Sequence, residues 1–531
     1  MWDQVYVPVA GSLPLSAAGA AIPIVILLIA LAGLRLAAWK AGLLGLAAAI
    51  LVALLMYGMP MRLVLAATAY GAAFGLFPIA WIVFWAVALY RLTVETGQFE
   101  LIKDSVGRLT QDRRMQALLI AFAFGAFIEG AAGFGTPVAV AAAMLTGLGF
   151  TPFYAAAICL IANTAPVAFG AIGTPLVTLA GVTNLPLASL SADVGRICAP
   201  VSLFIPAYLM LVMGGISGLR AVWPAAFVCG VCFALTQFLV SNFIGPYLTD
   251  ILASLATMLG LVLLLRIWHP ADAAPVAAAG SAPNVPAGTV LRAWSPYILL
   301  VIFVLLWGYA PFKALLDKAT VVFAWPGLDG QIRRLPPVVA TPAPYAAKFT
   351  FNVLSASGSA AMFATFLAAF ALGVPMGRLF RIIGRTARDL ALPILTIASV
   401  LALAYVMNYS GNTATLGLAF AASGALFPFF SAFLGWLGVF LTGSDTSANA
   451  LFGNLQVVTA NTLGLSPDLM AASNSSGGVM GKMISLQSIS VAAAATGMAA
   501  SEEARLFRFT LKHSLLLATV IGLVVVAYSY L

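Results

Sequence analysis

The sequence predicts an all-α, polytopic membrane protein of about 12 spans, because apolar runs long enough to cross a bilayer follow one another along the chain. Three observations support this class. Of the 531 residues, 63% are hydrophobic and only 8% are charged, whereas soluble domains carry about 25% charged residues. The mean hydropathy is +1.07. Several apolar runs are interrupted by glycine and proline, which predicts broken or re-entrant helices.

The first half of the chain, residues 1–266, contains spans and one pair of interrupted apolar runs. Uninterrupted runs predict spans near residues 13–34, 40–58, 62–92, 195–214, 221–241 and 246–266. A basic amphipathic stretch at 100–114 precedes the interrupted runs 115–150 and 152–184. Residues 267–292 are rich in Ala, Pro and Gly, and they predict a flexible loop between the halves.

The second half, residues 293–531, has a comparable order. Spans are expected near 294–311, 349–373 and 511–530, and residues 313–347 are expected to form a structured extramembrane loop. An arginine-rich amphipathic stretch, 377–389, precedes the interrupted region 390–490. That region divides into the runs 390–427, 428–458 and 466–490.

The two halves resemble each other at an offset of about 280 residues, which predicts the two repeats of a secondary transporter. FIEGAAGFGTPVAV (127–140) aligns with MNYSGNTATLGLAF (407–420), and NTAPVAFGAIGTPLV (163–177) falls opposite GSDTSANALFGNLQVV (443–458). The number of apolar segments between the interrupted runs leaves inverted and parallel repeats open. We expect inversion, by analogy with other transporters.

The four interruptions are expected to converge on one site. Non-helical backbone at membrane depth is tolerated only where it lines a cavity or is buried in protein. The N-terminal ends of broken helices carry partial positive charge and can bind an anion. We therefore expect the substrate to contact the small and polar residues at the breaks: Gly130, Gly133, Gly135, Thr136, Asn163, Thr164, Gly411, Asn412, Thr413, Thr442, Gly443, Ser444, Thr446 and Asn449. For any single polar residue of this set, capping of a half-helix is an equally good interpretation.

Four charged residues in apolar surroundings are candidates for proton coupling or charge pairing. Glu129 and Asp445 lie in interrupted stretches, where loss of water favours the neutral form of a carboxylic acid, so each is a candidate proton carrier. The alternative is a structural carboxylate that accepts N–H bonds at a helix start. Arg196 and Lys482 could pair with a carboxylate, or could lie at span ends and extend toward the interface. Asp193, three residues before Arg196, favours the structural interpretation for that arginine.

The sequence contains no pattern that indicates an enzyme, a metal site or a cofactor. No GxxxxGK[ST] motif occurs, so an ATP-driven motor is not expected, and both histidines, His269 and His513, lie in predicted loop or span-end positions. Basic residues lie beside spans, where they set membrane orientation rather than bind nucleic acid. We expect no cleavable signal peptide. The cysteines lie in apolar segments and are expected to be packing residues: Cys159, Cys198, Cys229 and Cys232.

Several long stretches resemble the bacterial L-lactate permease family, in family order and over nearly the whole chain. They are GAFIEGAAGFGTPVAV, LIANTAPVAFGAIGTPL, SNFIGPYLTDILASL, LTGSDTSANALFGNLQ, NSSGGVMGKMISLQSI and LFRFTLKHSLLLATVIGL. The resemblance is weakest in residues 267–345. One departure is Leu486 in MISLQS, where we expect the family to carry proline, which affects the geometry of that break rather than the class.

The resemblance implies a transporter of the bacterial inner membrane that imports 2-hydroxymonocarboxylates with a proton, L-lactate first and D-lactate and glycolate as co-substrates. It also implies an ion-transporter-like fold with re-entrant hairpins, of elevator type. Residues 115–184 and 390–490 would then move as a transport domain, and the remaining spans would form a scaffold and a homodimer interface.

Two other functions stay open at this point. One is a Na⁺-coupled carrier of another small organic anion, because hydroxyls, amides and carbonyls at broken helices also suit Na⁺. The other is a membrane-embedded enzyme, which would need a nucleophile and base or metal ligands within the spans.

Overall fold

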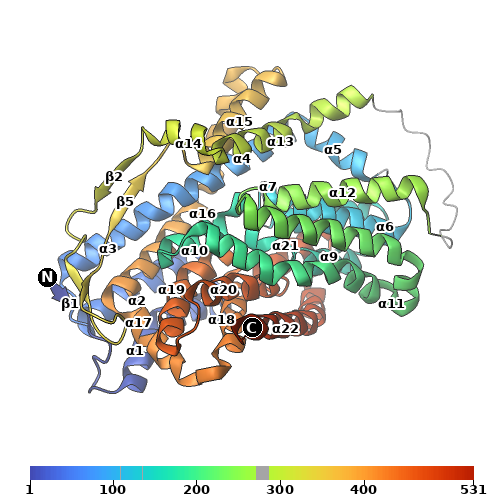
Figure 1. Ribbon diagram of the computed structural model, residues 1–531. Helices are drawn as coiled ribbons and strands as arrows, with labels where there is room; N and C mark the ends of the chain where they lie inside the picture. The colour runs from blue at the N-terminus through green and yellow to red at the C-terminus, as the bar shows by residue number, and fades with distance from the viewer. Residues whose placement is uncertain (108, 134, 271–285, 531) are drawn as a thin grey trace.

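The computed structural model describes residues 1–531 except 108, 134, 271–285 and 531, and it is built mainly of helices (Figure 1). The first half forms, in order, β1 (Trp2–Asp3), α1 (Leu13–Leu28), η1 (Ile29–Gly33), α2 (Ala38–Leu55), α3 (Met61–Phe74), η2 (Gly75–Ala80), α4 (Trp81–Glu95), α5 (Gln98–Gly107), α6 (Arg113–Gln116), η3 (Ala117–Phe124), α7 (Gly125–Ala131), α8 (Thr136–Gly147), α9 (Pro152–Ala162), η4 (Val167–Phe169), α10 (Gly170–Thr183), α11 (Leu187–Phe243) and α12 (Thr249–Ile267).

The second half forms, in order, α13 (Ala287–Gly308), α14 (Ala310–Asp317), β2 (Val321–Ala324), β3 (Ile332–Arg334), β4 (Ala343–Pro344), β5 (Lys348–Phe351), α15 (Ser357–Ala371), α16 (Met376–Ser410), α17 (Asn412–Phe420), η5 (Ala421–Leu426), α18 (Phe427–Thr442), α19 (Asp445–Leu463), α20 (Pro467–Lys482), α21 (Leu486–Thr496) and α22 (Ala500–Tyr530).

The number of spans agrees with the prediction of about 12 from apolar run lengths. Within the described ranges, 11 helices are long and apolar enough to cross a membrane, or up to 12 if the bent pair Pro152–Ala162 and Val167–Thr183 is one span. Helix α11 contains non-helical residues at Gly215 and Val222, and its two arms fold back on each other, as the two predicted spans require. Ser191 Oγ in the first arm donates to the Ser241 carbonyl in the second, at 2.8 Å.

Three segments differ from the expectations. The predicted span 349–373 begins as strand β5, and its helix starts only at Ser357. The amphipathic stretch 377–389 is not separate, because α16 runs without a break from Met376 to Ser410. Of the predicted loop 267–292, residues 271–285 lie outside the described residues, and 287–292 already belong to α13.

A small β-structure covers one end of the helical bundle, which the all-α expectation omitted (Figure 1). Strand β1 pairs in parallel with β3, β3 pairs with β4, and β2 pairs with β5 in antiparallel register. Arg333 forms an ion pair with Asp3 at 2.6 Å across the β1–β3 pair. The hydrogen bond and charge of Arg333 hold the pKa of Asp3 below its ordinary value. Residues 313–347 contain part of α14 and the strands β2, β3 and β4, and the pairing of β3 with β1 holds the N-terminus against this segment.

Helices α6 to α8 form a hairpin, called here the first hairpin. The chain enters through α6, η3 and α7, breaks after Ala131 and returns through α8. Gly133 and Gly135 on either side of the break have φ of +61° and +81°, a left-handed conformation that glycine adopts without a Cβ penalty. Arg113 Nη2, at the start of α6, donates to the Gly149 carbonyl just after α8, at 3.2 Å, so both ends of the hairpin lie on one face.

Helices α18 and α19 form the second hairpin. Gly443, with φ of +72°, ends α18, and Ser444 caps α19 by accepting a hydrogen bond from the Ser447 amide at 3.2 Å. Near the end of α19, Thr459 Oγ1 donates to the Gly417 carbonyl in α17, at 3.0 Å. Since α17 lies only a short distance before α18 in the chain, this hairpin also begins and ends on one face.

The two hairpins enter from opposite faces, and helix α22 shows this. Near its start, the Arg505 guanidinium lies 4.5 Å from the centre of the Phe153 ring, which follows the first hairpin. At its end, the Tyr530 hydroxyl donates to the Ala425 carbonyl, just before the second hairpin, at 3.0 Å. The 25 residues between these contacts span about 38 Å at 1.5 Å per residue, roughly a membrane thickness.

Each hairpin is followed by a helix that is broken in its middle. The first broken helix consists of α9 and α10 and bends by 66° at the break, and the second consists of α20 and α21. The first broken helix begins with Pro152 and Phe153, and Phe153 lies beside the start of α22. The second broken helix ends there instead, because α21 is the helix that directly precedes α22 in the chain. The two broken helices therefore run in opposite directions.

Helix α20 packs on the second hairpin at backbone contact distance. A Cβ on Gly435 would lie 1.8 Å from the Asn474 carbonyl oxygen, and one on Gly477 would lie 2.0 Å from that of Ala432. Such contacts leave no room for a side chain between α18 and α20, as in the close-packed interior of a protein.

Candidate functional site

A small buried cavity lies where the two hairpin tips meet the two broken helices. Its volume is about 50 Å³, which is room for a few water molecules. Both hairpins and both broken helices contribute to its wall: Glu129, Gly133, Val167, Gly170, Ala171, Pro175, Gly443, Ser444, Asp445, Thr446, Lys482 and Gln487. Segments that are more than 300 residues apart in the sequence thus form one polar site.

Glu129 is brought to the cavity by helix α7, one turn before the tip of the first hairpin. Its side chain is 4% exposed, and within the described residues its Oε2 has no hydrogen-bond partner. Its Oε1 faces Gly170 at the start of α10, where an added Cβ would lie 2.6 Å from that oxygen. The absence of a side chain at Gly170 therefore leaves the space that the Glu129 carboxyl group occupies. The Asn163 side chain lies close enough to interact with that carboxyl group.

Asp445 is the first residue of α19, and neighbouring side chains hold one of its oxygens. Its Oδ2 accepts hydrogen bonds from Ser475 Oγ at 2.5 Å and from Asn449 Nδ2 at 3.3 Å. Its Oδ1 packs against Gly478 and has no hydrogen-bond partner in the part of the chain that the structure describes. The Ser444 hydroxyl already caps α19, so the Asp445 carboxyl is not needed as a cap.

Lys482 places an ammonium group in the same cavity. It is the last residue of α20 and is only 6% exposed, so it does not extend to the interface as one interpretation of the sequence had it. Its Nζ donates to the Gly443 carbonyl at 2.6 Å, where the α18 backbone ends and its partial charge is negative. It interacts electrostatically with both Glu129 and Asp445.

Arg196 lies outside this cavity. Its Nη1 pairs with Asp193 Oδ1 at 3.0 Å, its Nε donates to Asn242 Oδ1 at 3.0 Å, and half of its side chain is exposed. The geometry matches the structural interpretation of this arginine.

Asn449, which donates to Asp445, belongs to a series of buried side chains that hydrogen-bond one another. Asn449 Nδ2 also donates to the Pro175 carbonyl at 3.2 Å, which ties α19 to α10. Its Oδ1 accepts from Asn474 at 2.9 Å, and Asn474 Oδ1 accepts from Gln456 at 3.1 Å. Sequence reasoning missed Ser475 and Asn474, although four consecutive polar residues at 473–476 in an apolar run were a signal.

One of the four expected breaks, the third in chain order, does not reach the cavity. Gly411, Asn412 and Thr413 lie where α16 meets α17, and the N-terminal segment covers this break. Gln4 Nε2 donates to the carbonyls of Asn408 and Tyr409, both at 2.9 Å. The break at 483–485, between Lys482 and α21, takes its place at the cavity. The expectation that the 411–413 break converges with the others was wrong, because the alignment paired it with the tip of the first hairpin.

The remaining expected site residues lie near the cavity without lining it. Thr164 Oγ1 donates to the Ile161 carbonyl and Thr442 Oγ1 to the Gly438 carbonyl, each at 2.7 Å, so both hydroxyls satisfy their own helices. Gly135 and Thr136 start α8. Gly130 packs against α12, where a Cβ would lie 2.7 Å from the Asp250 Cβ.

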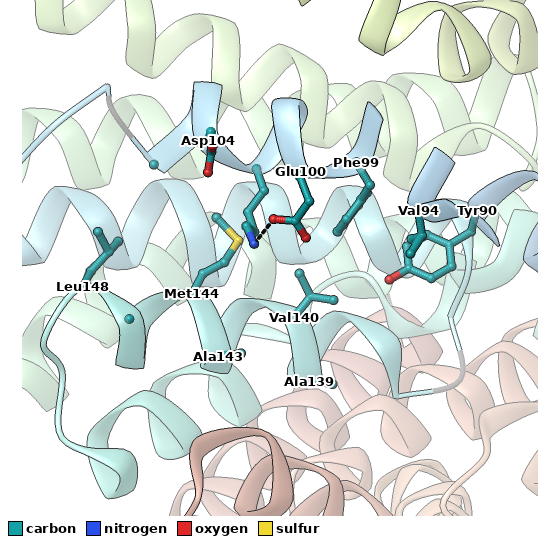
Figure 2. A pocket seen from close by; sticks show the side chains of 13 residues that line it. Tyr90, Val94, Phe99, Glu100, Asp104, Ala139, Val140, Ala143, Met144 and Leu148 are labelled. Atoms are coloured by element: carbon teal, nitrogen blue, oxygen red, sulfur yellow. Dashed lines mark ion pairs between the residues drawn. The ribbon is translucent and has the colours of Figure 1, made fainter. Parts of the chain in front are cut away.

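Larger cavities occur elsewhere but lack this convergence of charges. One of about 590 Å³ lies between α4, α5 and α8. In Figure 2 Glu100 and Asp104 lie along α5, and the labelled residues of the α8 wall are apolar. Glu100 forms an ion pair with Lys103, which also lines this cavity. Within the described residues no three His, Cys, Asp or Glu side chains form a metal-binding group.

Comparison with known proteins shows the same family over almost the whole chain. A sequence model of L-lactate permease matches residues 16–531. Glycolate permease GlcA of Escherichia coli K12 is 47% identical and covers 100% of this chain and 98% of its own. The L-lactate permease of Bacillus subtilis 168 is 47% identical and covers 98% of this chain and 97% of its own. The L-lactate permease of E. coli K12 is 45% identical and covers 100% of this chain and 98% of its own.

Among solved structures, the YdaH transporter of Alcanivorax borkumensis aligns with 88% of this chain and 86% of its own, at 15% identity and a TM-score of 0.45. MtrF of Neisseria gonorrhoeae aligns with 90% of this chain and 86% of its own, at 13% identity and a TM-score of 0.46. The extent and identity of the sequence matches place the chain in the L-lactate permease family of multi-pass membrane transporters.

Proposed function

We propose that this protein imports L-lactate, and the smaller 2-hydroxy acid glycolate, together with a proton across the bacterial inner membrane. One observation carries the proposal: a buried ammonium and two buried carboxyl groups share a small cavity at four helix breaks. Relatives that cover the whole chain are named for lactate and glycolate. D-lactate belongs to the same expected substrate range.

The substrate carboxylate would bind Lys482 and the start of α19. The cavity wall there includes Ser444, Asp445 and Thr446, and a helix N-terminus carries partial positive charge. The 2-hydroxyl group would hydrogen-bond a polar side chain of the same wall, for which Gln487 is available. A small polar anion is the class of ligand that fits this lining.

Proton coupling follows from the charges. With Lys482 protonated and both carboxyl groups ionised, the cavity carries one net negative charge, and a bound substrate anion would raise this to two. Uncompensated charge inside a membrane is costly, and protonation of one carboxyl group returns the loaded cavity to the net charge of the empty one. Glu129 is our candidate for that group, since hydrogen bonds from Ser475 and Asn449 stabilise an ionised Asp445.

The cavity also argues for a proton rather than Na⁺ as the coupling ion. Na⁺ at a broken helix uses backbone carbonyls at half-helix C-termini. At the end of α18 the Gly443 carbonyl is already bound by the Lys482 ammonium.

The arrangement of hairpins suggests how access alternates. We infer an inverted pair of repeats, 113–183 and 427–496, because the hairpins enter from opposite faces and the broken helices run in opposite directions. This pairing has an offset of roughly 310 residues instead of the 280 of the sequence alignment, and it matches the hairpin tips with each other. Both repeats would form the moving body, with the other spans as scaffold. A homodimer stays a prediction.

Orientation follows from the distribution of basic residues. The end of α4 and the start of α16 meet through ion pairs of Arg91 with Asp389 and of Arg385 with Glu95, on the face where the first hairpin begins. Five further basic residues lie near this face in α5, α6 and α16: Lys103, Arg113, Arg114, Arg378 and Arg381. Lys and Arg accumulate on the cytoplasmic side, so we assign this face to the cytoplasm and the strands to the outside.

The test is uptake of radiolabelled L-lactate into proteoliposomes of the purified protein in Na⁺-free buffer. With an inward proton gradient, transient accumulation above equilibrium is expected, and dissipation of the gradient with a protonophore should abolish it. Accumulation that needs Na⁺ instead, or that never exceeds equilibrium, would overturn proton symport.

A further inference from the structure

We propose that Asp250 is a proton-relay residue that connects Glu129 to a water-accessible cavity on the strand face. This inference rests on the proposed proton symport. Asp250 is not part of the substrate cavity, and neither composition nor motifs singled it out.

Asp250 is a buried acid that its own helix does not use. It lies in the first turn of α12 and is 1% exposed. An acid at this position normally accepts hydrogen bonds from the first N–H groups of the helix. Here neither carboxyl oxygen has a hydrogen-bond partner within the described residues. A buried acid without a partner is costly to keep, so its retention needs a reason beyond capping.

Asp250 lies directly against the helix that carries Glu129. Helices α7 and α12 touch at Gly130, where an added Cβ would lie 2.7 Å from the Asp250 Cβ and 3.1 Å from the Ile251 nitrogen. The two acids interact electrostatically, and the Glu129 Oε2 is also without a hydrogen-bond partner in the described chain. Two buried acids, each with at least one carboxyl oxygen that has no hydrogen-bond partner in the described chain, thus lie on helices that touch at Gly130.

A cavity of about 430 Å³ lies at the start of α12, and its lining reaches Leu248, two residues before Asp250. The chain that leads into α12, including Gly245, Tyr247 and Leu248, lines this cavity, together with the end of α13 and Lys313 of α14. These elements border the loop that carries the strands, on the face opposite the basic one. Asp250 is thus two residues from the lining of a cavity large enough for many water molecules, and it contacts the helix that carries Glu129.

The groups that face Asp250 leave few other routes for a proton. Helix α7 presents Glu129, and helix α11 presents the Cys198 thiol, which interacts with both Asp250 and Asp445. Segment η3, which also packs on α12, has only apolar side chains, ALLIAFAF. Along α12 itself the next charged residue is Arg266, at the far end of the helix.

The proposed step is a proton transfer without other bond changes. The carboxylic acid of Asp250 gives its proton to the Glu129 carboxylate and becomes ionised. A hydronium ion that reaches Asp250 through the cavity at the start of α12 then re-protonates its carboxylate and leaves a water molecule. One cation among three carboxyl groups cannot balance three ionised forms, so the cluster always has protons to pass on.

The test compares Asp250→Asn with the wild-type protein and with Ser254→Ala in proteoliposomes. Ser254 is buried one turn further along α12, and its Oγ donates to the Ile251 carbonyl of its own helix at 2.8 Å, so its change controls for altered α12 packing. Asp250→Asn should slow proton-driven net uptake by about 100-fold, the low end of what a positioned proton-transfer group contributes. Exchange of internal for external L-lactate at equal pH needs no proton release and should continue.

Two results would overturn the relay. One is wild-type net uptake in Asp250→Asn. The other is equal loss of exchange and net uptake in a protein that melts at the wild-type temperature, which would mean a role in binding or movement. Absence of proton-driven uptake in the wild-type protein would instead refute the proposed function itself.

Discussion

Replacement of Lys482 by glutamine removes the positive charge that this residue brings to the cavity while keeping a side chain of similar shape. Glutamine can still donate to the Gly443 carbonyl, although its amide is one bond shorter than the lysine chain that now reaches it at 2.6 Å. The change therefore tests the charge more than the packing.

The expected loss of L-lactate affinity in Lys482→Gln follows from the burial of the Lys482 side chain. Loss of one partner from a buried, hydrogen-bonded charge pair costs about 2–5 kcal/mol. At 1.4 kcal/mol per tenfold, even the low end weakens L-lactate binding by about 30-fold. Arg196→Gln is the matched control, because Arg196 is half exposed and pairs with Asp193 outside the cavity. Its effect should stay near the about 0.2–1 kcal/mol of exposed ion pairs.

The assay is isothermal titration of L-lactate into both detergent-purified variants, with melting temperatures as the check on folding. We expect weak or undetectable binding in Lys482→Gln and near wild-type binding in Arg196→Gln. Wild-type affinity in a folded Lys482→Gln protein would refute the assignment of Lys482 to the substrate carboxylate. A larger loss in Arg196→Gln than in Lys482→Gln would show that the wrong cavity has been chosen.

Three further changes test other parts of the site. Glu129→Gln should abolish accumulation of L-lactate driven by a proton gradient while exchange at equal pH continues, and wild-type accumulation would exclude Glu129 as the carrier. Gly170→Ala would bring a Cβ within 2.6 Å of the Glu129 Oε1. The resulting overpacking, about 1–3 kcal/mol, should shift the Glu129 carboxyl and lower the rate of proton-driven uptake, whereas an unchanged rate would show that the carboxyl position is not critical. Gly435→Ala would place a Cβ 1.8 Å from the Asn474 carbonyl oxygen, so the melting temperature should fall, and an unchanged value would contradict the rigid packing of α18 on α20.

The charged residues show how far sequence reasoning reached. Glu129 and Asp445 were identified because a carboxylate in an apolar, glycine-interrupted run has few structural explanations, and the structure brings both to one cavity. Lys482 and Arg196 looked alike in sequence, since each is a single basic residue in a largely apolar segment. Only the packing separates them, because α20 is enclosed by α18 and α19, whereas this part of α11 is partly exposed.

Neither the burial of Asp250 nor the pairing of the proposed repeats could be predicted from the sequence. Asp250 follows a glycine- and proline-containing loop, as many surface acids do, and its burial depends on the contact of α12 with Gly130. The alignment at an offset of about 280 followed local similarity of apolar residues, whereas the repeats that we propose pair the two hairpin tips, which share no strong sequence pattern.

The sequence by itself determined the membrane class, the approximate spans and the places where helices break, because hydropathy, glycine and proline act locally on the backbone. The tertiary structure alone decided which breaks meet, which cation faces the carboxyl groups and which face each hairpin enters from. These depend on contacts between segments hundreds of residues apart, such as Asn449 with Pro175, and no local preference encodes such contacts.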